Sequence, residues 1–200
     1  SYRDVLPIFK RMERYDGGDP DIRGRSGQIR ITDTVERGRL YDSIFDAAAS
    51  VGIKHNPDYN GPDQEGIAMT QASIGRGRRM STAHCYLDPI RNKPNIDIET
   101  GALAERLLFD GKRCIGVRYK VKGEVREATA TREVIVSCGA IASPQLLELS
   151  GIGQPERLRE VGIEVRHALK GVGENLRDHW SPRMKWYVAP LGETFNEKLK

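Results

Sequence analysis

The segment from Glu133 to Gly153 has the residue types and spacing that could hold a cofactor. The apolar run Val134-Ile-Val136 has strand length and is expected to be buried on both faces. Gly139 then allows a turn, Ser143 is a good helix N-cap, and Pro144 suits the first helical position. The segment therefore predicts a buried strand, a tight turn and a helix.

Ligands of open α/β sheets bind beyond the C-terminal ends of parallel strands. The predicted strand ends at Cys138, Gly139 and Ala140, which makes these residues candidates for contact with a cofactor. The alternative is a glycine needed only for the turn. Strand–turn–helix units of this kind also occur in α/β proteins that bind no flavin.

The same segment resembles one of the two signature motifs of the glucose–methanol–choline family of flavin oxidoreductases. That motif asks for a small pair, Ser-Pro, two aliphatic residues and Ser-Gly-aliphatic-Gly at set spacings. The matching residues are Gly139-Ala140, Ser143-Pro144, Leu146-Leu147 and Ser150-Gly151-Ile152-Gly153. The resemblance implies FAD as cofactor and oxidation of a small-molecule alcohol, with hydride transfer to the flavin and a general base that takes the hydroxyl proton.

The resemblance extends over nearly the whole chain and points to the choline dehydrogenase-like branch. It is carried by Asp58–Gly66 (DYNGPDQEG), by Gly77–Ala83 (GRRMSTA) and by Gly171–Leu176 with Asp178-His179. By resemblance, the backbone at Leu103 contacts the adenine ring, and Asn60, Gln64 and His84 lie on the substrate side. The alternatives are a plain strand start at Leu103, turn propensity at Asn60 and Gln64, and a surface position for His84. Lys170 and Glu148 depart from the branch, where Pro and an apolar residue are usual.

Two parts of the family pattern are absent from this sequence. A strand–Gly-x-Gly-x-x-Gly–helix unit would bind the FAD pyrophosphate, but Gly75, Gly151 and Gly171 each begin a Gly-x-Gly without the third glycine. The family's catalytic His also has no counterpart, so no catalytic residue is assigned. We expect an internal piece of a longer enzyme that has no turnover alone and binds FAD weakly. The alternative is a non-catalytic module that folds or self-associates through its truncated sheet without cofactor.

His179 could serve as a general base because histidine titrates near neutrality, but the resemblance makes the Asp178-His179 pair structural or adjacent to the cofactor. Arg76, Arg78 and Arg79 form a basic cluster. Nucleic-acid binding would require interleaved aromatic residues, and none lies near this cluster before Tyr86. A solvated loop, or a loop near the flavin, is the better interpretation, and we expect no nucleic-acid partner.

Composition limits the remaining classes. The 200 residues are 38% hydrophobic and 30% charged, with a net charge of +4, and no apolar run approaches the ~20 residues that a membrane helix needs. Cys85, Cys114 and Cys138 form no Cys-x-x-Cys, so we expect no disulfide and no metal site, and core positions for the last two thiols. A reducing, bacterial-type cytoplasm is the expected location, and peripheral association with a membrane is left open.

Hydrophobic periodicity and turn residues predict the elements that position these sites. Helices are expected at 1–15, 39–51, 81–87 and 155–161, and strands at 28–32, 96–98, 134–136 and 163–166. Asp110-Gly111 and Gly123 predict the turns of a three-stranded antiparallel meander between Leu107 and Thr131. The fold class is α/β with mixed α+β content, namely part of an FAD/NAD(P)-binding doubly wound fold with an inserted antiparallel meander, plus part of a substrate domain. The expected domains are 1–92 (substrate side), 93–167 (C-terminal half of the FAD domain) and 168–200 (return to the substrate domain).

Overall fold

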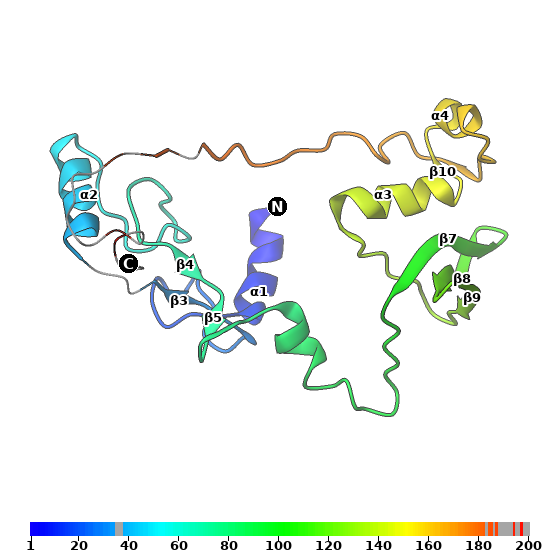
Figure 1. Cartoon of the computed structure of the whole chain (residues 1–200), viewed down its shortest axis with the longest axis horizontal. Coiled ribbons are helices and arrows are strands. Elements are labelled where there is room, and N and C mark those ends of the chain that lie inside the picture. Colours follow the sequence, from blue (N-terminus) through cyan, green and yellow to red (C-terminus); the bar gives the residue numbers. More distant parts are fainter. Residues whose placement is uncertain (35–37, 183, 186, 188–193, 195–196, 198–200) are drawn as a thin grey trace. The chain divides into compact units, whose positions relative to one another are not determined.

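The computed structural model describes residues 1–34, 38–182, 184, 185, 187, 194 and 197. The chain forms two compact units, one from Ser1–Asp97 with Lys185–Lys200 and one from Ile98–Met184. Figure 1 labels the elements of both units along the chain. No helix among the described residues is both long and apolar enough to cross a membrane.

The first unit begins with helix α1 (Tyr2–Met12), as the apolar spacing predicts. Two short strands, β1 (Glu13–Arg14) and β2 (Ile29–Arg30), pair in parallel directly after it. Gly27 allows this close return, because a Cβ there would lie 2.1 Å from the backbone of Met12. The predicted strand 28–32 is thus divided between β2 and β3 (Thr32–Asp33), and β3 pairs with β4 (Gln71–Ala72) instead.

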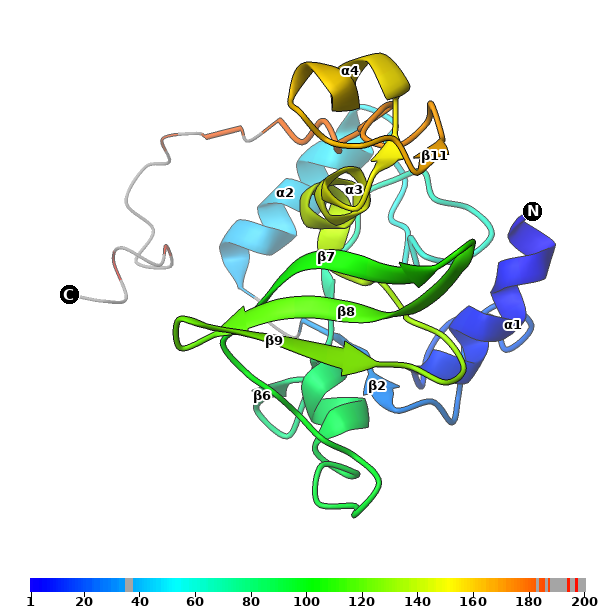
Figure 2. The ribbon, with the colours of Figure 1, turned by 90° about the vertical axis from the view of Figure 1, so that its right-hand side faces the viewer.

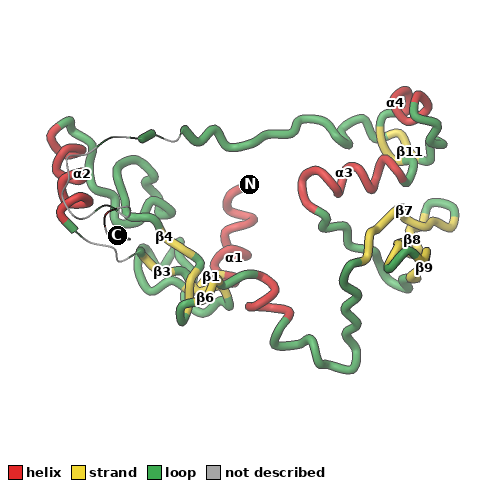
Figure 3. Tube along the Cα trace, in the orientation of Figure 1, coloured by secondary structure: helices red, strands yellow, loops and turns green. Residues whose placement is uncertain are grey.

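Helix α2 (Arg39–Ser50) confirms the second predicted helix and buries Ala48. It ends as predicted at Gly52, whose φ of 83° lets the N–H of Ile53 reach the carbonyl of Ala48 at 2.9 Å. The hairpin of β5 (Ile74–Gly75) and β6 (Arg78–Arg79) follows, and then the short π-helix η1 (Ala83–Leu87) at the predicted helix 81–87. Much of this unit is loop between these short elements (Figure 3).

The second unit confirms the predicted meander. Strands β7 (Ala102–Asp110), β8 (Arg113–Val121) and β9 (Glu124–Thr129) form one antiparallel sheet in this order. The turns are Gly111-Lys112, one residue later than predicted, and Lys122-Gly123, as predicted. Gly111 and Gly123 have φ values of 53° and 88°. Leu107 and Val121 are buried on the sheet.

Helix α3 (Gly139–Leu149) contacts β7, and Figure 2 shows it almost end-on beside that strand. Two further short strands, β10 (Ile152–Gly153) and β11 (His167–Ala168), pair in parallel around helix α4 (Pro155–Glu160). Helix α4 confirms the prediction for 155–161. The predicted strand 163–166 is wrong by a few residues, because the pairing partner of β10 begins at His167.

Two predicted strands do not form. The segments 96–98 and 134–136 have no strand assignment, and Ile135 is 78% exposed. A strand buried in a parallel sheet needs neighbours that accept and donate its backbone hydrogen bonds, and none of the described residues pairs with either segment. Cys138 is exposed for the same reason, so its predicted core position is wrong, whereas Cys114 is half-buried.

Candidate functional site

A buried arginine organises the first unit around the predicted substrate-side loop. Arg23 is 3% exposed, and its guanidinium donates to both carboxylate oxygens of Glu13, at 3.0 and 2.6 Å. It also pairs with Asp58 and lies 4.2 Å from the centre of the Tyr15 ring. Since a buried charge is tolerated only when it is paired, Glu13 and Asp58 allow this guanidinium to remain in the interior.

Gln71 connects this cluster to the predicted residue Asn60. Its amide nitrogen donates to Asp58 at 3.0 Å and to the Tyr15 hydroxyl at 3.1 Å. Its amide oxygen accepts from Arg23 at 3.1 Å and from the Asn60 side chain at 2.9 Å. The amide of Asn60 is therefore oriented by a network that begins at a fully buried charge.

Asn60 and Gln64 line the same cavity, which has a volume of about 890 Å³. One wall is the apolar side of α1, and the opposite wall is the loop from Tyr59 to Gln64. Arg23, Glu13 and Gln71 also line the cavity. An apolar cleft with a few convergent polar groups is the usual form of a small-molecule site.

The buried cluster shifts the pKa values of its members. Burial and the hydrogen bond to Asp33 raise the pKa of Tyr15 to about 12. Burial alone would raise the pKa of Glu13, but the hydrogen bonds from Arg23 and the backbone of Gly24 outweigh it and lower that pKa. Tyr15 is therefore a neutral hydrogen-bond donor and Glu13 an anion at neutral pH.

We expect Tyr15 to ionise at a higher pH than a tyrosine in water, whose pKa is about 10. In an absorbance titration of tyrosinate, the native chain should show one component that is still neutral above pH 11, and Tyr15→Phe should remove it. The unfolded chain loses this proton at about pH 10, so it binds fewer protons than the native chain between pH 10 and 12. Stability should consequently fall with rising pH in that range. A titration of Tyr15→Phe identical to that of the wild type would contradict the assignment.

His84 does not lie at this cavity. It lines a separate one with residues of β1, β2 and the β5–β6 hairpin. The Nδ1 atom of His84 lies 3.2 Å from the Asp88 carboxylate. The backbone N–H of His84 donates to the Ser81 hydroxyl at 3.2 Å. The structure thus brings Asn60 and Gln64 together and places His84 elsewhere in the same unit.

The predicted cofactor residues lie in the second unit and are all exposed. Cys138 directly precedes α3, and Gly139 and Ala140 form its first two residues. Gly139 has a φ of 90°, and a Cβ placed there would meet no atom within 4 Å. Leu103, near the start of β7, is 67% exposed. The first N–H groups of a helix have no partner within the helix, so the start of α3 presents free donors next to an uncovered glycine.

The predicted N-cap at Ser143 is wrong, because α3 begins at Gly139 and Ser143 lies inside it. The Ser143 hydroxyl instead accepts a hydrogen bond from the backbone N–H of Cys138 at 2.9 Å. Ser143 therefore stabilises the backbone at Cys138, just before the helix, although it lies inside the helix itself. Pro144 likewise lies inside the helix and not at its first position as predicted, so the carbonyl of Ala140 has no i+4 N–H to accept from.

Two residues near the end of the signature segment, Ser150 and Gly151, hold neighbouring elements together. Ser150 is buried, and its hydroxyl accepts from the backbone N–H of Leu107 at 2.8 Å and donates to the carbonyl of Leu146 at 2.6 Å. Gly151 has a φ of 82°, and a Cβ there would lie 2.4 Å from the carbonyl oxygen of Glu164. These two residues fasten α3 to β7 and to the loop before β11.

Comparison with known proteins agrees with this architecture. Residues 1–181 match the family model described as GMC oxidoreductase. The chain belongs to the GMC oxidoreductase family. Oxygen-dependent choline dehydrogenase of Chromohalobacter salexigens is 42% identical over 206 residues, which cover 94% of this chain and 37% of that protein. The same-named protein of Burkholderia ambifaria is 41% identical, with 95% and 36% covered.

A solved structure confirms the fold class. An FAD-dependent oxidoreductase from Chaetomium thermophilum superposes with a TM-score of 0.83 at 28% identity, over 89% of this chain and 33% of that one. The chain thus spans about a third of the length of the relatives that it matches. The mixed helix and sheet content is that of GMC oxidoreductases.

Sequence reasoning missed the Arg23 cluster of this GMC oxidoreductase. The segment 14–27 is rich in Gly, Asp and Pro, a composition typical of loops, and an isolated arginine in a loop carries no periodic signal. Its carboxylate partners are 10 and 35 residues away in sequence, so only the fold brings them together.

Proposed function

We propose that this chain forms parts of the cofactor and substrate sites of an FAD-dependent oxidoreductase that oxidises an alcohol of the choline class. The match of Gly139–Gly153, which spans α3 and β10, to the family signature carries the proposal. The relatives named as choline dehydrogenases support the substrate class. We also propose the division into 1–92 on the substrate side, 93–167 in the FAD domain and 168–200 in the return.

The residues at the start of α3 fit a flavin nucleotide. Uncovered backbone donors at the N-terminus of an 11-residue helix suit an electron-rich oxygen or a phosphate, and the missing side chain of Gly139 permits close approach. Cys138, Gly139 and Ala140 would hold the cofactor, with Leu103 against its adenine. FAD, when bound, would supply the oxidant that accepts a hydride, that is two electrons and one proton, from the alcohol carbon.

On the substrate side, Asn60 and Gln64 offer uncharged hydrogen-bonding groups to an alcohol, and Asn60 is oriented through Gln71. We assign no general base to this chain. His179 is exposed, and its backbone N–H donates to the carboxylate of its neighbour Asp178 at 2.8 Å. His84, proposed on the substrate side by resemblance, lies outside the cavity of Asn60 and Gln64. The 200-residue chain should therefore show no turnover of choline with a dye acceptor.

The cofactor assignment is tested by FAD titration of the purified chain, followed by flavin fluorescence anisotropy. We expect weak saturable binding that is lost on desalting, because the sequence has no Gly-x-Gly-x-x-Gly unit. Gly139→Ala should weaken binding about fivefold or more, since the new methyl group occupies the uncovered space and the φ of 90° disfavours a side chain.

Gly162→Ala is the matched control. Gly162 also has a positive φ of 76° and open space around it, but it lies after α4, away from the start of α3 in sequence. Equal losses in the two variants, or no binding at all, would refute the cofactor assignment. Bleaching of the flavin band by choline without oxygen, in the longer enzyme that contains this sequence, tests the alcohol separately.

We further propose self-association through apolar surface of the second unit. Ile135 and Ile141 are 78% and 76% exposed. Exposed apolar side chains of this kind favour contact with a second copy of the chain, because such contact removes them from water. A bacterial-type cytoplasm is the proposed location, supported by the three free cysteines. No nucleic-acid partner is proposed.

A further inference from the structure

The first unit contains a second cavity, of about 840 Å³, that is rich in arginine. Arg14 of β1, Arg30 of β2, and Arg76 and Arg78 of the β5–β6 hairpin line it, together with Thr32 and His84. We call this cavity the arginine groove. None of the described residues that line it is Asp or Glu, so its arginines are not opposed by a carboxylate within the lining.

The guanidinium groups of the groove are largely uncompensated. Arg30 lies 3.3 Å from the exposed Asp16, whereas Arg14, Arg76 and Arg78 form no ion pair with any residue in the described part of the chain. Arg14, Arg76 and Arg78 are exposed, so water screens their mutual repulsion and their N–H donors remain accessible to an anion. Such an arrangement is typical of a site whose counter-charge is a ligand.

The hairpin holds its arginines in a defined conformation. Arg76 and Gly77 have φ values of 52° and 71°, as in a two-residue turn with both residues in the left-handed region. Asn is the usual choice at the first of these positions, and arginine is strained there because its Cβ lies close to the following carbonyl oxygen. An arginine thus occupies a position that backbone preference alone would not give it.

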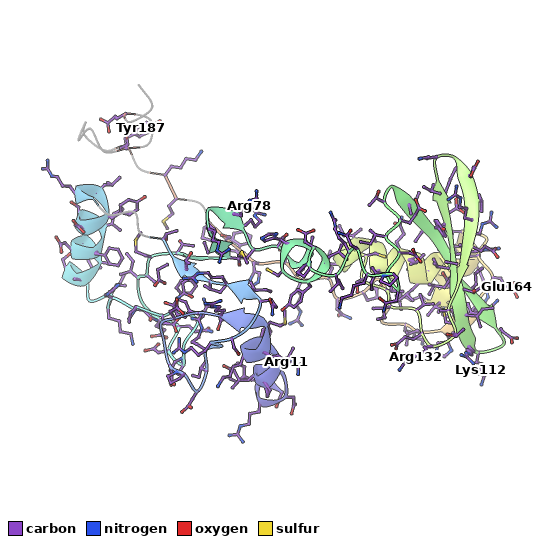
Figure 4. All side chains as sticks on the ribbon, turned by 90° about the horizontal axis from the view of Figure 1, so that it is seen from below. Arg11, Arg78, Lys112, Arg132, Glu164 and Tyr187 are labelled. Atoms are coloured by element: carbon purple, nitrogen blue, oxygen red, sulfur yellow. The ribbon has the colours of Figure 1, made fainter. Side chains whose placement is uncertain are left out.

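Neighbouring residues of a strand point to opposite sides, and β6 shows this alternation. Arg78 lines the groove, but Arg79 does not. The charge of Arg78 consequently lies at the groove, whereas the charge of Arg79 lies elsewhere on the hairpin. Figure 4 labels Arg78 on this hairpin.

We propose that the arginine groove binds a compact polyanion of the phosphate class, phosphate or pyrophosphate, either free or as an ester. Several guanidinium groups from separate strands can each donate to a different oxygen of a tetrahedral anion, whereas one carboxylate would satisfy a single arginine. The Thr32 hydroxyl and His84 add further polar groups to the same wall. The inference does not depend on the proposed flavin site, which lies in the other unit.

The test is isothermal titration of the full 200-residue chain with inorganic pyrophosphate at low ionic strength, with acetate and sulfate as comparisons. We expect saturable binding that weakens about five- to tenfold in Arg78→Ala, because one charge-assisted donor is lost at an open site. Arg79→Ala removes the same charge from the adjacent position and should change the dissociation constant by less than about twofold. Arg14→Ala, on a different strand, should repeat the loss.

Circular dichroism of each variant shows whether the fold is retained, and Gly162→Ala, in the second unit and outside both proposed sites, should leave pyrophosphate binding unchanged. The proposal is overturned by equal losses in Arg78→Ala and Arg79→Ala, which would indicate diffuse charge. It is also overturned if pyrophosphate binds no better than acetate, or if only a long oligonucleotide binds. Titration with a monoester such as phosphoserine separates an ester ligand from free phosphate.

Discussion

Replacing Gly151 by Ala is expected to destabilise the second unit by about 2–5 kcal/mol, the larger part of the stability of a small unit. Two effects add. A φ of 82° costs an alanine about 1–2 kcal/mol. The new Cβ would also lie 2.4 Å from the carbonyl oxygen of Glu164, and this backbone atom cannot rotate away as a side chain can.

The displaced backbone is itself part of the pairing. The carbonyl of Gly151 accepts hydrogen bonds from the N–H groups of Arg166 and His167, at 2.8 and 3.0 Å. Relieving the contact with Glu164 moves the loop that carries these donors, so the pairing of β10 with β11 is disturbed as well. Urea unfolding followed by circular dichroism measures the loss.

Gly162→Ala separates the two effects. Gly162 has a φ of 76°, similar to that of Gly151, but no atom would lie within 4 Å of its Cβ. We expect a loss of only about 1–2 kcal/mol, that of the backbone conformation. If both variants lost the same stability, the close approach to Glu164 would carry no energetic weight and the role assigned to this motif glycine would be wrong.

Features that depend on neighbouring residues could be predicted from the sequence. The meander follows from alternating residues and from glycines at Gly111 and Gly123, because the turn needs a positive φ wherever the strands lie. Helix α2 likewise ends at Gly52, where the predicted stop signal lies. The register of the first hairpin was still predicted one residue early, since Asp110-Gly111 and Gly111-Lys112 are both acceptable turns.

Features that depend on partners distant in sequence could not be predicted. The run 134–136 has every local property of a buried strand, but a strand requires a neighbour, and no described segment provides one. Ser143 has the chemistry of an N-cap, yet it serves the N–H of Cys138 from inside the helix. Of the candidate sites, the loop at Asn60 and Gln64 could be proposed from the family pattern. The charge cluster around Arg23 could not be predicted, since no local sequence pattern indicates a buried arginine.

Removing that arginine is the second large effect that we expect. Arg23→Ala should destabilise the first unit by about 3–5 kcal/mol at pH 7, because it leaves Glu13 and Asp58 as partly buried carboxylates without their cation. One oxygen of Asp58 already has no hydrogen-bond partner among the described residues, which leaves it little capacity to compensate. Arg11→Ala, at an exposed position of α1 (Figure 4), should change stability by less than about 0.5 kcal/mol.

The pH dependence distinguishes loss of charge pairing from loss of packing. In the wild type the pKa of Glu13 is lowered, so its contribution is present above the unfolded value near 4.5 and is lost as pH falls below it. In Arg23→Ala, burial without the cation should raise that pKa, so acidification neutralises the uncompensated charge and relieves the variant. The stability difference between the two proteins should therefore shrink between pH 7 and pH 4. A difference that stayed constant over this range would mean that Arg23 acts by filling space, and that the orientation of Asn60 through Gln71 does not depend on its charge.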